Sequence, residues 1–267
     1  MSGWQRNRRG REGLMARILT DETSLSRRKR RLVTEGEALS KLHVIEAVGA
    51  GVVLLGGLTL FFTTGQTMLL WVSVILGILA FGHWWQAKQN LNEGKSLEAG
   101  IAGEAEVTKK LGDYLDNRYF VFNDIVLTRG RTSAQLDHLV VGPNGVFVIE
   151  TKNWRGRVVG DVGDRMWRQL RNDRNRATPL SSPYLQNQRH KDVVVQMIEA
   201  SGLEVPDVVD LLVNRNRRAT FEISGLPIPI LEPSEACEYI ARHRGQRVYS
   251  EEEVDKVVGM FMKAVGG

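Results

Sequence analysis

Two long apolar stretches occupy much of the first third of the chain. From Val44 to Phe62 the only charged residue is Glu46, and from Met68 to Trp85 there is no Asp, Glu, Lys or Arg. Each stretch is close to the roughly 20 residues that a helix needs to cross a bilayer. The pattern predicts two transmembrane helices, about 44–62 and 68–85, within the segment 42–85. The alternative is a helical hairpin buried inside a soluble protein.

The positive charge of the chain lies mainly before this segment. Residues 1–41 contain 11 of the 36 Lys and Arg residues but only 5 of the 31 Asp and Glu residues. Lys88 and Lys95 follow the second apolar stretch, whereas the polar link 63–67 has no basic residue. The positive-inside rule then places both ends in the cytoplasm. The sequence therefore predicts a two-span cell-membrane protein with membrane lipid as a partner, a basic cytoplasmic region 1–41 and a linker 86–96.

After the linker the pattern changes to that of a mixed domain, 97–267. A helix is predicted at 97–115, and β-branched and aromatic residues predict a strand at 119–128. Strand-like runs at 157–160 and 166–170 are expected to extend the same sheet. The remaining elements are helices near 183–200, 234–243 and 251–265 and strands at 208–213, 221–223 and 228–231.

The stretch from Ala134 to Trp154 predicts a β-hairpin. Two apolar runs flank Gly142-Pro143-Asn144-Gly145, a cluster that can supply turn dihedrals. If these four residues form the loop, Val141 faces Val146. Counting outward from that pair fixes which side chains share a face of the sheet.

This count brings three ionisable side chains to one face. Asp137 lies opposite Glu150, with Lys152 two residues further along. Carboxylates directly across a strand pair repel each other, and a divalent cation such as Mg²⁺ or Mn²⁺ would remove the repulsion. Lys152 could then hold an attacking water or a phosphate charge. The alternative is a solvated Asp137 followed by a charged strand end.

A fourth acidic residue belongs to the apolar side of the predicted helix 97–115. Glu104 shares a wedge of about 80° with Leu97, Ile101, Thr108, Leu111 and Leu115. A carboxylate on a core-facing side is costly unless it is paired, protonated or bound to a metal. Glu104 is therefore a site candidate, although a position at the edge of the stripe would let it reach water.

Other chemistries lose support. Cys237 is the only cysteine, which excludes an intramolecular disulfide and a thiolate zinc site. The chain contains no HExxH, GxSxG, GxGxxG or GxxxxGK[ST] motif. Metalloprotease, serine-hydrolase, dinucleotide and P-loop readings are therefore disfavoured.

Three sequence motifs resemble one known family. They are GEAEV around Glu104, NDI at Asn123 to Ile125, and QLDHLVVGPNGVFVIETKNWRG from Gln135 to Gly156. Together they are similar to the nuclease-related domain, NERD, a branch of the PD-(D/E)XK nuclease superfamily. The resemblance covers about Glu98 to Val213, and the remainder of the domain is a C-terminal extension.

The resemblance implies a restriction-endonuclease-like α/β fold, with a mixed central sheet flanked by helices. By motif, Glu104 matches the helix acid, Asp137 the D, Glu150 the (D/E) and Lys152 the K. Together with the two predicted spans, this resemblance predicts a membrane-anchored nuclease, in which Asp137, Glu150 and Glu104 hold Mg²⁺ or Mn²⁺ and nucleic acid is the substrate, with DNA favoured over RNA. The rival is a catalytically silent, membrane-tethered binding or signalling module.

The predicted helix from Pro183 adds two polar candidates. Gln186 and His190 share a wedge with the apolar residues Val193, Val194 and Met197. Gln186 is similar to a glutamine that orients the substrate or the lysine in many of these nucleases, whereas His190 replaces a tyrosine common in some branches. Structural packing of both side chains is the alternative.

A run of arginines lies between the lysine strand and this helix. Arg155, Arg168 and Arg171, together with His190, are candidates for substrate contact, because guanidinium groups bind phosphates. The same run also contains Arg157, Arg165, Arg174 and Arg176. The alternative is a solvated loop that is partly neutralised by aspartates.

Overall fold

The computed structural model describes residues 15–19, 51–65, 67–170, 177–204 and 206–266, with isolated positions between 34 and 49. The chain divides into two compact units. One consists of Ser24–Ala99, and the other of Met1–Thr23 with Gly100–Gly267. The basic N-terminal region lies largely outside the described residues.

The unit Ser24–Ala99 is helical where it is described. Residues 51–64 form a helix, Gly65 has a φ of +70°, and α2 (Thr67–Tyr114) follows. A Cβ atom at Gly77 would lie 2.7 Å from Leu54 of the preceding helix. Glycine therefore lets these two helices come close together.

The predicted membrane hairpin is wrong. In the part of the chain that the structure describes, no helix is both long enough and apolar enough to cross a membrane. The prediction treated 68–85 as a separate helix, but these residues are the first part of the 48-residue α2. That helix continues through Lys88, Glu93 and Lys95, so the predicted linker 86–96 is helical as well. The cell-membrane location inferred from the hairpin falls with it.

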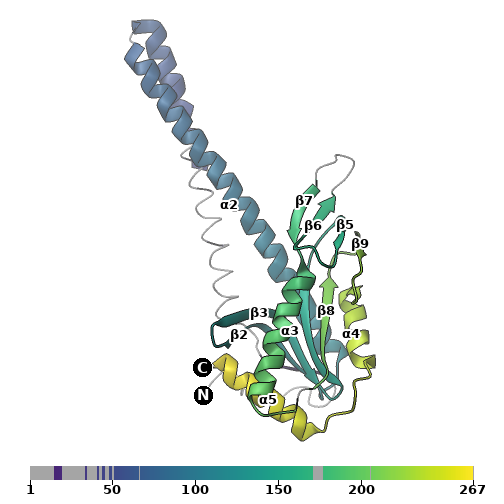
Figure 1. The fold of residues 1–267 in the computed structure, drawn as a ribbon. Helices are drawn as coiled ribbons and strands as arrows, with labels where there is room; N and C mark the ends of the chain where they lie inside the picture. The colour runs from purple at the N-terminus through teal and green to yellow at the C-terminus, as the bar shows by residue number, and fades with distance from the viewer. Residues whose placement is uncertain are drawn as a thin grey trace. The chain divides into compact units, whose positions relative to one another are not determined.

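A six-stranded mixed sheet forms the centre of the second unit (Figure 1). Its strand order is β1-β2-β3-β4-β8-β10, with antiparallel pairing from β2 to β4 and parallel pairing at the other junctions. The strands are β1 (Arg17–Ile18), β2 (Phe120–Arg129), β3 (Thr132–Gly142), β4 (Gly145–Lys152), β8 (Val208–Asn214) and β10 (Ile230–Leu231).

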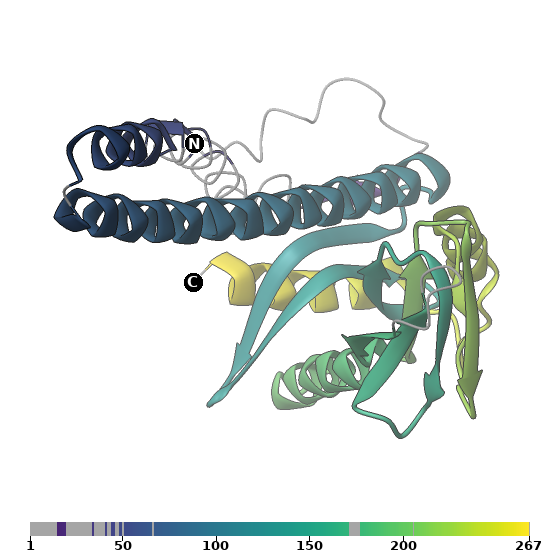
Figure 2. The ribbon, with the colours of Figure 1, turned by 90° about the horizontal axis from the view of Figure 1, so that it is seen from above.

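Helices cover both faces of this sheet. α3 (Pro183–Ala200) and α5 (Glu251–Gly266) pack on one face around a core that includes Phe122, Val194 and Phe261 (Figure 2). The last turns of α2 and α4 (Pro233–Arg242) pack on the other, around a core that includes Leu111 and Ile149. The predicted α/β fold, a mixed sheet flanked by helices, is confirmed.

A second sheet follows β4 in the chain. It contains β5 (Gly156–Asp161), β6 (Met166–Leu170), β7 (Ala177–Ser181) and β9 (Ala219–Ser224), in the order β7-β6-β5-β9. The sequence predicted that β5 and β6 extend the first sheet. They form a separate sheet because the chain turns after β4, where Gly156 has a φ of +71°. Val158 and Trp167, both fully buried, form the centre of its core.

The predicted hairpin is confirmed in register. Val141 pairs with Val146, and Gly142 pairs with Gly145. Gly145 has a φ of +142°, and a Cβ atom there would lie 2.6 Å from the Asp207 carbonyl oxygen, so glycine is required. The hairpin turn also anchors the end of α4, because Asn144 Nδ2 donates hydrogen bonds to carbonyl oxygens of that segment.

Candidate active site

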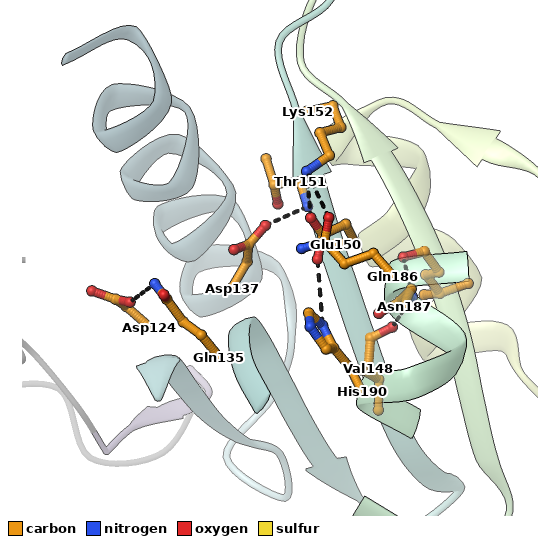
Figure 3. A network of polar contacts seen from close by, with 11 residues as sticks. Asp124, Gln135, Asp137, Val148, Glu150, Thr151, Lys152, Gln186, Asn187 and His190 are labelled. Carbon is orange, nitrogen blue, oxygen red and sulfur yellow. Dashed lines mark hydrogen bonds and ion pairs between the residues drawn. The ribbon is translucent and has the colours of Figure 1, made fainter. Parts of the chain in front are cut away.

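The two strand acids lie where the pairing of β3 and β4 ends. The last pair is His138 with Ile149, one residue before Asp137 and Glu150 would face each other. Beyond this pair, a side chain and not the backbone links the two strands: Asp137 Oδ2 accepts a hydrogen bond of 2.7 Å from the Thr151 backbone N–H (Figure 3).

Asp124 marks a matching interruption on the β2 side. Asn123 pairs with His138 and Ile125 pairs with Leu136, so Asp124 is at the register position opposite Asp137. Asp124 is buried with a φ of +46°, and its Oδ1 accepts a 2.8 Å hydrogen bond from Gln135 Nε2. A non-glycine residue in this region of φ is strained, and such strain clusters at functional sites. The NDI motif contains Asp124, but periodicity alone gave no sign of the strain.

Glu150 is the most deeply buried acid of the cluster, with 1% of the residue exposed. Lys152 Nζ donates a hydrogen bond to its Oε1. Its Oε2 receives no hydrogen bond from any residue in the described ranges. The His190 Nδ1 atom lies 3.5 Å from this Oε2 atom (Figure 3). A buried carboxylate oxygen without a donor is costly, and either a proton on Glu150 or a bound cation would remove this cost.

The electrostatics of the cluster favour protonation of Glu150. The pKa of its carboxyl is raised from 4.5 to about 8, first by burial and next by the negative charge of Asp137. Glu104 raises the pKa further by a smaller amount, while Lys152 opposes the shift through its charge and hydrogen bond. The ion pair with Lys152 is thus outweighed by desolvation and by the neighbouring carboxylates.

Lys152 connects the strand acids to α3. Its ammonium group contacts Glu150 and lies 3.5 Å from the Gln186 Oε1 atom. Ser182 caps α3, since its hydroxyl accepts a hydrogen bond from the Leu185 backbone N–H, and Pro183 starts the helix. Gln186 therefore projects toward the site from the second turn, as Figure 3 shows.

His190 lies one turn further along α3 and is 8% exposed. Burial, together with the smaller effect of the Lys152 charge, lowers the pKa of its imidazole to about 4, so the ring is neutral at pH 7. The sequence assigned His190 to substrate contact. The structure places its Nδ1 atom 3.5 Å from Glu150 Oε2, and neither atom has a hydrogen-bond partner among the described residues.

Glu104 stands at the margin of the cluster. It is half-buried on α2, and its charge acts on Glu150, but it is the weakest of the named influences on that pKa. Within the described ranges, no three His, Cys, Asp or Glu side chains are arranged to hold a metal ion. The assignment of Glu104, Asp137 and Glu150 as metal ligands stays a prediction.

A buried network joins the helix of Glu104 to the strand of Asp137. The Asn123 Oδ1 atom accepts a 3.0 Å hydrogen bond from Thr108 Oγ1 and lies 2.9 Å from His138 Nδ1. His138 is fully buried, and burial lowers its pKa to about 3, which keeps the ring neutral. The network links α2 to β2 and β3 through Asn123.

The structure describes only some of the arginines predicted to contact the substrate. Arg155 and Arg168 are exposed on the second sheet and the loop that leads to it. Arg171, Arg174 and Arg176 lie outside the described residues. A pocket of about 190 Å³ elsewhere in the domain, bordered by Leu203, Tyr249 and Val257, contains none of the predicted site residues.

Asn187 is a site-supporting residue that the sequence did not reveal. It is fully buried, and its Nδ2 donates to the carbonyl oxygens of Val148 (3.0 Å) on β4 and Leu211 (3.1 Å) on β8. These bonds fix the first turns of α3, which carry Gln186 and His190, to the strand of Glu150. An asparagine beside Gln186 in a polar helix start carries no pattern that separates it from a surface residue.

We expect Asn187→Ala to destabilise the domain by about 2–3 kcal/mol, because two hydrogen bonds to buried carbonyl oxygens are lost. Urea denaturation measures the change. The control is Gln196→Ala on an exposed position of the same helix, which is expected to change stability by less than about 0.5 kcal/mol. Equal effects of the two substitutions would show that Asn187 does not fix α3 to the sheet.

Comparison with known proteins agrees with the geometry. Residues 99–213 match the family model of the nuclease-related domain, NERD, which confirms the resemblance inferred from the motifs. An uncharacterised protein of Bacillus anthracis is 32% identical over 101 residues, which cover 38% of this chain. The matched region spans 47% of that relative's length. No solved structure matches the chain.

Proposed function

We propose that the domain is a metal-dependent phosphodiesterase that hydrolyses nucleic acid, with DNA as the preferred substrate. One observation carries the proposal: Glu150 is almost completely buried, beside a second strand carboxylate, with one oxygen that no described residue bonds. A protein selected for stability alone gains nothing from this arrangement, whereas a bound cation would compensate it. The match to the nuclease-related domain supports the same conclusion.

The residues present fit a hard divalent cation. Mg²⁺ binds one or two carboxylates and completes its octahedron with water and substrate phosphate, so it does not need three protein ligands. Asp137 and Glu150 would hold the ion, and Glu104 would orient its water from the margin of the cluster. When bound, Mg²⁺ or Mn²⁺ would supply Lewis-acid chemistry at the scissile phosphate.

The remaining side chains would act by position and charge. Lys152 would stabilise the attacking hydroxide or the charge that develops on the phosphate oxygens, as a fixed cation in a partly buried site. Gln186 would hold the Lys152 ammonium in place through its amide oxygen. His190, neutral and buried, would limit the movement of the Glu150 carboxylate.

The test is metal dependence. The full chain is incubated with supercoiled plasmid in Mg²⁺, in Mn²⁺ and in excess EDTA, and nicking and linearisation are followed on gels. We expect cleavage with either ion and none with EDTA. Cleavage of the same rate in EDTA would contradict the proposal, and so would the absence of cleavage with every nucleic acid tested, including single strands and RNA.

A second function is favoured by one observation. The described acids do not assemble a three-ligand metal group, and Lys152 already neutralises part of Glu150. This arrangement also suits a nuclease-like domain that binds nucleic acid without cleaving it. Tight binding with no cleavage in Mg²⁺ or Mn²⁺ would establish the second function in place of the first.

A further inference from the structure

The segment between Lys152 and Gln186 leaves the candidate site and returns to it. β4 ends at Lys152, and β5 begins at Gly156. β7 ends at Ser181, and α3, which carries Gln186, begins at Pro183. Both ends of this segment are thus close in sequence to site residues, so the chain connects the second sheet directly to the candidate site.

The second sheet has a buried face and an exposed face. Val158, Trp167 and Gln169 are buried on one side, and the Gln169 Nε2 atom fixes the Arg155 carbonyl oxygen at 2.7 Å. Side chains alternate along a strand, so the other side carries Arg157 and Arg168. Val159 pairs with Arg168 on one neighbouring strand and with Glu222 on the other, which places Glu222 on the same exposed face.

Arginine dominates the charge of this segment. Residues 153–181 contain seven Arg and three Asp, with no Lys or Glu. The whole of 97–267 has 23 Lys and Arg against 24 Asp and Glu, so the excess of positive charge is local. We define the arginine face by the described, exposed residues Arg157 and Arg168, which share one side of the sheet; Arg155 and Arg165 are exposed in the connections next to β5 and β6. Guanidinium groups bind phosphates through a planar array of donors.

The aromatic residues of the segment do not reach this face. Trp167 is fully buried, and its Nε1–H donates to the Asp161 carbonyl oxygen. Trp154 packs against Trp167 and Phe221, with ring centroids 6.1 and 6.5 Å apart. Proteins that hold single strands stack bases on exposed aromatic rings. Among the described residues of the second sheet, no such platform is exposed.

We propose that the arginine face binds the sugar-phosphate backbone of duplex nucleic acid on one side of the bond that the site cleaves. This inference rests on the proposed function and adds its substrate class: a duplex, held through phosphates without reading of bases. A duplex presents one negative charge per about 1.7 Å of its axis, which suits a fixed array of guanidinium groups. Glu222 limits the binding, since its carboxylate lies 3.5 Å from the Arg157 guanidinium.

The experiment measures binding apart from cleavage. The full chain is titrated, in EDTA, with a labelled duplex of about 30 base pairs and mixed sequence, over a series of salt concentrations. Fluorescence anisotropy gives the affinity and its salt dependence. We expect Arg168→Gln to weaken binding about tenfold at 0.1 M salt and to reduce the log–log salt slope by about 1. Arg157→Gln is expected to act in the same direction.

Two further variants test whether the charge at this face, and not charge in general, sets the affinity for the duplex. Glu222→Gln releases Arg157 and is expected to strengthen duplex binding several-fold. Arg242→Gln, with the same change of charge on an exposed position of α4, is expected to leave the affinity within about twofold. Circular dichroism confirms that each variant is folded, which is expected because all four side chains are largely exposed.

Each outcome decides for or against the arginine face. Weaker binding by the Arg157 and Arg168 variants, but not by Arg242→Gln, supports the arginine face. If the chain binds in this way but cleaves nothing, only the catalytic proposal fails. Unchanged binding by these variants overturns it, even if plasmid is cleaved. No duplex binding by the wild type, or tighter binding to the matching single strand than to the duplex, also overturns it.

Discussion

Replacing Lys152 with Met is expected to lower the rate of plasmid cleavage by about 10²- to 10³-fold, the usual effect of removing one fixed charge from a hydrolytic site. Methionine has a similar length and keeps the packing of the side chain. The loss should appear in the rate at saturating DNA, because Lys152 acts on charge that develops during the reaction and not on the ground state. Single-turnover cleavage in Mg²⁺ measures it.

The control for this prediction is Lys256→Met. Lys256 is exposed on α5 and forms an i,i+4 ion pair with Glu252, so its loss is expected to change neither cleavage nor duplex binding by more than about twofold. Duplex binding by Lys152→Met should also remain close to wild type, since phosphate contact is assigned to the arginine face. A Lys152→Met variant that cleaves at the wild-type rate would remove Lys152 from the mechanism.

Much of the domain could be predicted because its signals are local. The hairpin followed from a turn sequence between two apolar runs, and its register, Val141 with Val146, was predicted correctly. The position of Gln186 beside Lys152 followed from helical spacing together with a family motif. In both cases a short stretch of chain determines which side chains share a face, so periodicity is sufficient.

The sequence-based predictions fail where contacts between residues far apart in the chain determine the structure. β5 and β6 read as strands, but only their pairing with β9, from residues 219–224, shows that they form a second sheet. Asn187 reads as a surface residue until β4 and β8 supply the carbonyl oxygens that it binds. The membrane hairpin was inferred from the absence of charge within two windows, which takes no account of how far α2 extends.

The same physics explains the strain at the site. Asp124 has a positive φ, the β3–β4 ladder stops at His138, and Glu150 is buried beside another acid. Each feature costs stability, and the three lie at one register position across neighbouring strands. Such concentration is typical of a site in which function opposes stability, and the surrounding cores supply the compensation.

The stability of the metal-free protein is expected to depend on pH through Glu150. Its folded pKa of about 8 lies above the unfolded value near 4.5, so the folded state binds the proton more tightly. Stability therefore falls as pH rises from about 4.5 to about 8, because the folded state must then either keep a proton that the unfolded state has lost or bury a charge. The full shift corresponds to about 5 kcal/mol.

Glu150→Gln removes this group, so its stability relative to wild type is expected to increase by up to about 4 kcal/mol between pH 5 and pH 8.5 in EDTA. Urea denaturation at both pH values measures the difference, and its change with pH is independent of any packing effect of the amide. The control, Glu253→Gln, concerns a half-buried acid whose pKa is lowered to about 2, mainly by its hydrogen bond with Arg247, so its difference from wild type should be nearly constant over this range. Addition of Mg²⁺ should stabilise wild type at pH 8.5 and leave Glu150→Gln nearly unchanged, because a cation favours the ionised carboxylates. A difference that does not vary with pH would show that Glu150 is ionised in the folded protein, and the case for a cation at this site would lose its main support.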